Sequence, residues 1–274
     1  MQEIEYIYRL GGCQQKFIES LGSIGPVYLQ ARNRGGGLGR HLKQFQPLLI
    51  PEMTYAVDPD SGLAFSLDEY VSSHFINQEF PELSERIDFE FGCFPAGLSL
   101  VSMPELPGAG AIADFVRDQQ CVPISDDELV QWREELGYEF GMCECCQEAA
   151  AKRGRNPEAH ALHTLFSELI KNGDSIRIQL FSEHVDFISK LFPKRLDVKP
   201  GYLVLTDTSE YSILHLNMEL VHAVQIGVKR IDDELSSVAS IYDSHGNMNF
   251  QFTTPGREAA ARWDSIFSES AQDN

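Results

Sequence analysis

Three cysteines lie close together in the segment Cys143-Glu-Cys145-Cys146. Thiolates ligate soft metal ions and also carry out redox chemistry. The segment falls in a stretch that we predict to be helical, where Cys143 and Cys146 would share a face and Cys145 would point away. At most two of the three could then ligate one ion, and zinc would need further ligands such as Cys121 and a histidine. The segment is open to three interpretations: inert thiols, a zinc or iron site, and a redox sensor.

A cationic, glycine-rich segment follows the first predicted strand. Arg32, Arg34 and Arg40 surround Gly35-Gly-Gly37. A glycine backbone can approach an anion closely, and guanidinium groups neutralise its charge. No Walker lysine follows the glycines, so the segment does not indicate nucleotide binding. We expect a flexible turn that is either solvated or binds an anion.

Among the eight histidines, His163 is the best placed to act as a ligand. It shares one face of a predicted helix with Phe166, at a spacing of three residues. A histidine at that position can ligate a metal, or it can bond to a nearby carbonyl group or to water. His160, one turn earlier, is the alternative ligand. His215 lies between leucines in a predicted strand, a setting typical of a packed core residue.

The elements that must position these residues mix helix and strand in the first half of the chain. The spacing of apolar residues predicts a broken helix over residues 4–21, and period-two alternation predicts strands over residues 27–29, 62–67 and 88–91. Residues 95–124 contain several Pro and Gly and show no clear period. We therefore expect an α+β first half.

Ser125 and Glu128 form a capping-box pattern that predicts a long helix ending near Ala151. The basic, Gly-containing segment 152–156 is typical of a hinge. We therefore predict a domain boundary there, between residues 1–152 and 153–274. Asn156 as N-cap and Pro157 at the first helical position predict a second helix through Lys171, ended by Asn172-Gly173.

In the rest of the chain, apolar and polar residues alternate with a period of two. This alternation predicts successive strands over residues 176–180, 185–188, 202–205, 211–216, 223–228, 238–242 and 248–252. The connections are too short for crossover helices, so we expect an antiparallel meander. An amphipathic helix over residues 257–269 would cover one face of its sheet.

The region from Tyr211 to Phe267 resembles the cytoplasmic haem-utilisation proteins, also called hemin-degrading or hemin-transport factors. The matching elements are Ile213-Leu-His-Leu216, 224–230, 236–243 with Gly246, Phe250-Gln-Phe252, and Pro255-Gly-Arg-Glu258 leading to Trp263. In the first half, Leu21-Gly-Ser-Ile-Gly-Pro-Val27 followed by Ala31-Arg-Asn33 is similar to the family's other repeat. The resemblance implies two similar α+β halves with antiparallel sheets, and a flat ligand held in a cleft between them.

The resemblance also implies a ligand and its contacts. Family members carry a haem-ligating histidine in a His-x-x-Phe pattern on a helix, which His163-Thr-Leu-Phe166 matches. Haem needs an axial ligand, an apolar wall and basic partners for its propionates. The candidates for ligation are His163, His160 and His215, and those for the propionates are Arg32 and Arg34. Transfer, storage and degradation of haem are all compatible with this set.

The formal net charge of −19 would repel a phosphate backbone, so we expect no nucleic-acid partner. The start of the chain lacks a signal peptide, and no apolar run of roughly 20 residues is present, so we expect a cytoplasmic protein without membrane insertion. A monomer and a homodimer are both compatible with the sequence. The alternatives to haem binding are a metal- or redox-responsive module that uses the three cysteines, and a noncatalytic adaptor on the same fold.

Overall fold

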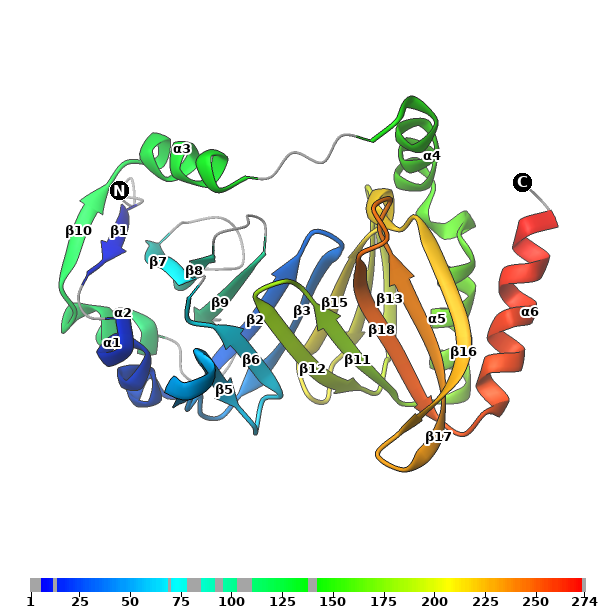
Figure 1. Cartoon of the computed structure of the whole chain (residues 1–274), viewed down its shortest axis with the longest axis horizontal. Helices are drawn as coiled ribbons and strands as arrows, with labels where there is room; N and C mark the ends of the chain where they lie inside the picture. Colours follow the sequence, from blue (N-terminus) through cyan, green and yellow to red (C-terminus); the bar gives the residue numbers. More distant parts are fainter. Residues whose placement is uncertain are drawn as a thin grey trace. The chain divides into compact units, whose positions relative to one another are not determined.

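The structure is a computed structural model of the whole chain (Figure 1). It describes residues 6–11, 14–68, 70–77, 85–91, 96–102, 110–137 and 142–272. The chain forms two compact units. The first comprises Met1–Arg32, Gly39–Glu139 and Glu183–Phe187, and the second comprises Asn33–Leu38, Phe140–Ser182 and Ile188–Asn274. The predicted α+β class is confirmed; the boundary at residue 152 stays a prediction.

The first unit is built on antiparallel strands. One run has the order β10-β1-β7-β8-β9-β2, and its strands are β1 (Tyr6–Leu10), β2 (Val27–Asn33), β7 (Tyr70–Asn77), β8 (Glu85–Phe91), β9 (Gly97–Ser102) and β10 (Cys121–Ile124). A second run is the meander of β4 (Leu48–Ile50), β5 (Tyr55–Asp58) and β6 (Leu63–Ser66). Strand β3 (Gly36–Leu42) follows β2.

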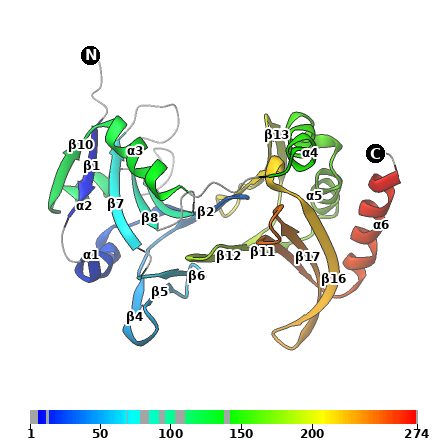
Figure 2. The same cartoon turned by 45° about the horizontal axis from the view of Figure 1, so that its top comes forward.

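Three helices belong to the first unit: α1 (Gln14–Ser20), α2 (Ala111–Arg117) and α3 (Asp126–Leu136). Short 3-10 turns, η1 (Leu21–Ser23) and η2 (Pro51–Met53), connect strands. Figure 2 shows α3 alongside β7 and β8. The capping box predicted at Ser125 is confirmed, since its hydroxyl accepts from the Glu128 N–H and the Glu128 carboxylate accepts from the Ser125 N–H.

Two predictions for this region are wrong, and residues 95–124, for which no element was predicted, contain regular structure. The N-terminal part of the expected helix over residues 4–21 is strand β1, because β1 pairs with β7 and β10 on its two sides. Within residues 95–124 lie β9, α2 and β10. Every residue of β9 is buried, including the serines Ser99 and Ser102. The helix expected to run to Ala151 ends at Leu136, and a separate helix, α4 (Glu144–Arg155), follows.

The second unit contains two further antiparallel runs. The first is β13 (Arg195–Lys199), β14 (Tyr202–Asp207) and β15 (Ser212–Asn217). The second has the order β16-β17-β18-β11, formed by β16 (Ala223–Ile231), β17 (Glu234–Tyr242), β18 (Met248–Pro255) and β11 (Ile176–Phe181). The antiparallel prediction is confirmed. Strand β12 (Val185–Leu191) pairs through its first three residues with β6.

Helices α5 (Ala161–Asn172) and α6 (Glu258–Gln272) pack beside each other against one face of the β16-β17-β18-β11 run (Figures 1 and 2). The Phe166 ring of α5 meets the Phe252 ring of β18 edge-on, with centroids 5.4 Å apart. Trp263 of α6 is fully buried. The amphipathic C-terminal helix is therefore present as the sequence predicts.

The start of α5 differs from the prediction. Pro157 begins a separate 3-10 turn, η3 (Pro157–Ala159), and the N-cap of α5 is His160 rather than Asn156. Of the residues expected to form a hinge, 152–156, the first four are the last turn of α4 and Asn156 is its C-cap. Their basic side chains interact favourably with the negative end of the helix dipole. The end of α5 is as predicted, with Gly173 in the left-handed conformation. Among the described residues, none of the helices is long and apolar enough to cross a membrane.

Candidate functional site

The histidines of α5 occupy two different environments. The His160 imidazole caps the helix: its Nδ1 accepts from the Leu162 N–H at 3.2 Å, and its ring packs edge-on against Phe267. Burial, assisted by the charge of Arg153, lowers the pKa of His160 to about 4. His160 is therefore neutral near pH 7, and because its Nδ1 is an acceptor, the ring proton is on Nε2. A metal could bind this ring only after the cap broke.

His163 lies one turn further along α5 and is half-buried. Its backbone N–H donates to the carbonyl of His160 at 2.9 Å, within the first turn of the helix. The side chain stands at the flank of the buried stripe that includes Phe166. A ligand that binds there would meet an imidazole next to apolar side chains, which is the environment that an axial haem ligand requires.

The glycine-rich segment contains a hairpin turn at Arg34-Gly35 between β2 and β3, so the turn expected there is present. The buried Asn33 amide holds the turn by donating to the carbonyls of Phe181 and Asn249, at 2.7 and 2.8 Å. The Asn217 N–H donates to the Gly35 carbonyl at 2.8 Å. These contacts fix the backbone that carries Arg34.

The same turn lies against the strand that carries His215. Gly36 has φ +144°, and a Cβ there would collide with the carbonyl of His215, so only glycine fits. His215 is half-buried on the face of β15 opposite the buried Leu214 and Leu216. Burial and then the charge of Lys199 lower its pKa. The second unit thus brings the backbone of the Arg34 turn and His215 together.

Arg32 lies in the first unit and is part of a buried charged cluster that sequence analysis missed. The carboxylates of Asp88 and Glu90 on β8 are buried beneath Arg133 of α3, whose Nη2 lies 2.8 Å from Asp88 Oδ2 and 2.6 Å from Glu90 Oε1. Arg32 Nη2 is 3.9 Å from Asp88 Oδ1. The alternation of Asp88 and Glu90 with Phe89 and Phe91 was the available signal, since it puts two acidic side chains on one face of a buried strand.

The electrostatics of the cluster follow from its composition. Burial by itself raises the pKa of Asp88, but the charges of Arg32, Arg86 and Arg133 and a hydrogen bond from Ser99 outweigh it and lower the pKa to about 2. The carboxylate is therefore ionised at neutral pH. With its charge already neutralised by Asp88, Arg32 is poorly suited to bind an added anion.

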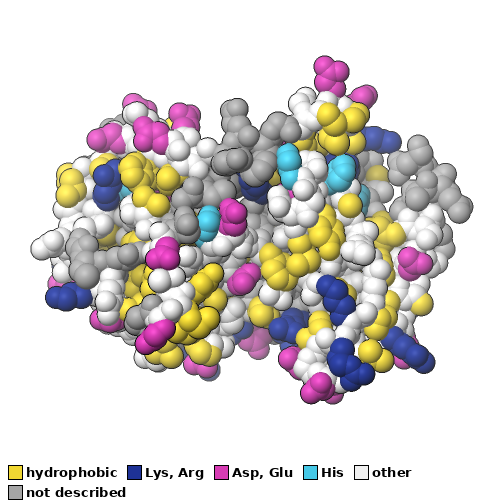
Figure 3. All heavy atoms as spheres, in the orientation of Figure 1, with side chains coloured by type: hydrophobic (Ala, Val, Ile, Leu, Met, Phe, Trp, Pro, Cys, Tyr) yellow, Lys and Arg dark blue, Asp and Glu magenta, His cyan; other side chains and the backbone are white. Residues whose placement is uncertain are grey.

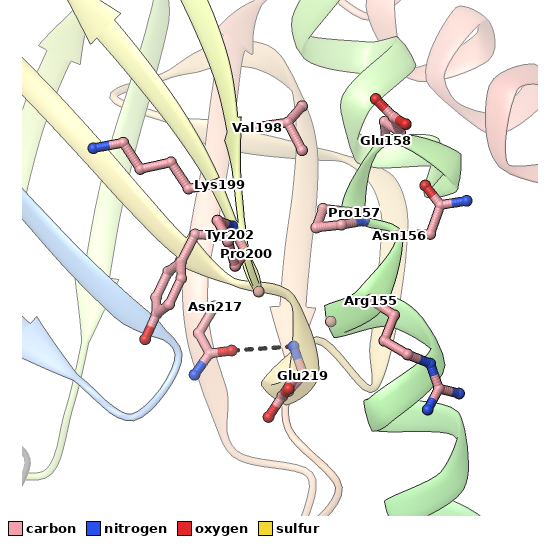
Figure 4. A pocket seen from close by; sticks show the side chains of 12 residues that line it. Arg155, Asn156, Pro157, Glu158, Val198, Lys199, Pro200, Tyr202, Asn217 and Glu219 are labelled. Atoms are coloured by element: carbon pink, nitrogen blue, oxygen red, sulfur yellow. Dashed lines mark hydrogen bonds between the residues drawn. The ribbon is translucent and has the colours of Figure 1, made fainter.

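A hollow of about 580 Å³ lies between the C-terminal end of α4 and the turn that joins β13 to β14 (Figure 4). Its charged side chains include Arg155, Glu158, Lys199 and Glu219. Figure 4 shows Lys199 and Arg155 directed to opposite sides. The volume is that of a small-molecule site, but a specific site needs polar groups that converge on the ligand, and these do not.

The three cysteines gather at the N-terminal end of α4. Their sulfur atoms all lie within 4.8 Å of one another, and Cys143 Sγ is 2.9 Å from Cys145 Sγ. The expectation that only two of them could meet is wrong, because Cys143 is the extended N-cap residue (φ −64°, ψ 157°) rather than part of the helix. Hydrogen bonding to Cys145 and to the helical N–H groups lowers the pKa of Cys143 to about 7, and hydrogen bonding to Cys143 raises that of Cys146 to about 11.

No protein-family model and no curated protein matches the chain. Solved structures do. The haem-degrading enzyme ChuS of Escherichia coli O157:H7 has a TM-score of 0.66 and 13% identity, over 96% of this chain and 86% of that one. PhuS in its apo form, a haem-binding protein from Pseudomonas aeruginosa, has a TM-score of 0.65 and 14% identity over the same shares.

The chain has the fold of these haem proteins. The likeness runs through both units, whereas the sequence resemblance is concentrated in the last 60 residues or so. At this level of identity the comparison concerns the fold, and the roles of individual residues rest on their own geometry.

Proposed function

We propose that this protein binds haem inside the cell and serves haem utilisation, by transfer, storage or breakdown. The observation that carries the proposal is the likeness over 96% of the chain to ChuS and PhuS, whose structures are described as those of a haem-degrading enzyme and a haem-binding protein. A fold alone hosts many functions. The second support is therefore local, and comes from the donor groups of the second unit.

His163 is the proposed axial ligand. Its side chain is half-buried near the start of α5, whereas the Nδ1 of His160 is used in capping that helix. His215 is the second choice, because burial already favours its neutral, metal-binding form. If haem were degraded, the bound iron would supply the oxygen chemistry with an external reductant, and the protein would supply ligation and shielding.

Arg34 is the proposed partner of a haem propionate. Its backbone is fixed by the hydrogen bonds of Asn33 and Gly35, so a guanidinium there is presented from a rigid turn. Arg32, the other candidate, faces the carboxylate of Asp88. A rigid carrier matters because binding then costs little conformational entropy.

The test is a hemin titration of the full-length protein followed in the Soret region. Wild type should show a shifted Soret band that saturates at one hemin per chain. His163→Ala should shift the band or remove it and weaken binding at least about tenfold, the factor that corresponds to ~1.4 kcal/mol. His222→Ala is the matched control, because His222 is exposed at the start of β16, and it should titrate like wild type.

The result distinguishes the ligands. If His215→Ala rather than His163→Ala changes the spectrum, the ligand is on β15 and haem binding itself stands. An unchanged hemin spectrum in the presence of equimolar wild-type protein would overturn the proposed function.

A further inference from the structure

The N-terminal end of α4 presents three sulfur donors from adjacent positions. Cys143 and Cys145 are exposed and Cys146 is half-buried. Figure 3 shows yellow side chains, the class that includes cysteine, at the surface on this end of α4. The three thiols are therefore accessible from solvent and face one another.

Their spacing fits a single metal ion. A metal bonded to three sulfurs at about 2.3 Å holds the sulfurs about 4 Å apart. The three Sγ atoms lie within 4.8 Å of one another without any change of backbone. The pair at 2.9 Å, Cys143 and Cys145, must separate by about 1 Å, which side-chain rotation of two exposed residues can supply.

The backbone supplies the second requirement of a thiolate site, which is stabilisation of negative charge on sulfur. Cys143 is the N-cap of α4, so the three thiols lie at the positive end of the helix dipole. The N–H groups of the first turn have no partner within the helix. The loop is closed by Gln147, whose amide donates to the Met142 carbonyl at 2.7 Å.

We propose that Cys143, Cys145 and Cys146 form a three-thiolate site for a thiophilic metal ion such as Zn²⁺ or Cu⁺. Thiolates select these soft ions over Mg²⁺ or Ca²⁺. With three protein ligands, a tetrahedral ion keeps one position open toward solvent, and an external ligand or a receiving protein can reach it. The site is independent of the proposed haem site, whose donors are imidazole and guanidinium groups.

The experiment is a Cd²⁺ titration of the reduced, metal-free, full-length protein, with the thiolate-to-metal charge-transfer band in the ultraviolet as readout. Wild type should bind one Cd²⁺ per chain, and Zn²⁺ and Cu⁺ should displace it in competition. Cys143→Ser, Cys145→Ser and Cys146→Ser should each weaken binding at least about a hundredfold, the upper end of the loss caused by removing a group outside the ligand set.

Cys121→Ser is the matched control, because Cys121 is an exposed free thiol on β10 in the other unit, and it should leave binding unchanged. Circular dichroism of each variant verifies that it is folded, and a hemin titration of Cys143→Ser should match wild type. Equal Cd²⁺ affinity in the four variants would overturn the proposal. So would a disulfide among the three residues, found by mass spectrometry in anaerobically purified protein that binds no Cd²⁺, since that would identify a redox pair instead.

Discussion

Helix α3 of the first unit and helix α5 of the second contact their sheets through opposite kinds of chemistry. In the first unit, α3 places Arg133 over two fully buried carboxylates on β8. In the second unit, α5 places Phe166 and its leucines on Phe252, with aromatic and aliphatic contacts. Apolar packing tolerates imprecision at a modest cost, whereas a buried ion pair that loses one partner leaves an uncompensated charge. The contact of α3 with its sheet should therefore depend more on charge than the contact of α5 with its sheet.

The largest loss of stability is expected when Arg133 is replaced. Arg133→Met keeps the bulk of the side chain but removes the guanidinium that hydrogen-bonds Glu90 and leaves Asp88 with the hydrogen bond from Arg86. We expect a loss of about 3–5 kcal/mol of unfolding free energy. Urea and thermal unfolding measure it. Arg117→Met is the control, because the exposed pair of Arg117 with Asp114 should be worth only about 0–1 kcal/mol. A loss below 1 kcal/mol for Arg133→Met would show that the cluster does not stabilise the first unit.

A second prediction uses pH. His74 on β7 is fully buried, with Nδ1 3.9 Å from Glu90 Oε1, and burial followed by the charges of Arg9 and Arg133 lowers its pKa from 6.5 to about 4. Between these values the unfolded chain binds a proton that the folded protein does not. The contribution of neutral His74 to the unfolding free energy is thus complete above about pH 6.5 and is lost as pH falls toward about 4.

The measurement is the unfolding free energy of wild type and His74→Gln as a function of pH. We expect the slope between pH 6.5 and 4 to be smaller in the variant, because Gln cannot be protonated there. His160 has a similarly lowered pKa and supplies a second contribution to the slope in the same range, so the slope should not vanish. Identical slopes for the two proteins would contradict the assignment of His74 to this range.

The smallest expected effect belongs to the cap of α5. His160→Ala removes the acceptor of the Leu162 N–H, and loss of an N-cap costs about 1 kcal/mol. Thr164→Ala, an exposed change on the same helix, is the control. The variant also sharpens the haem assignment, since His160→Ala should retain the Soret shift that His163→Ala loses. Loss of the shift in His160→Ala alone would reverse the roles of the two histidines.

Local signals in the sequence predict the local features well. The Ser125 capping box, Gly173 at the end of α5 and the period-two strands of the second unit all involve residues within a few positions of one another. Features set by distant partners do not appear in such patterns. Strand β1 forms because β7 and β10 flank it, and the charged cluster exists because Arg133 meets a strand more than 40 residues away.

The candidate sites follow the same rule. Spacing along a helix places His163 and Phe166 correctly on one flank of α5, but it cannot reveal that His160 is used as a cap. It also misplaces the cysteines, because one unpredicted helix end turns Cys143 back over Cys145 and Cys146. The contact between the Arg34 turn and β15 depends on Asn33, whose partners are about 150 and 216 residues away in the chain.

The two ends of helix α4 differ in the contacts of their described residues. Hydrogen bonds hold its C-terminal turn in place. The Gly154 carbonyl accepts from the Gly201 N–H, and the Arg153 guanidinium donates to the carbonyls of Met218 and Glu219. Apart from the half-buried Cys146, residues 143–149 are exposed. The three sulfur atoms therefore lie at the exposed end of the helix, away from its hydrogen-bonded end. Metal binding at the thiols can therefore occur without a change in the hydrogen bonds of the C-terminal turn. We expect the melting temperature of the second unit to be independent of whether the thiols hold a metal ion.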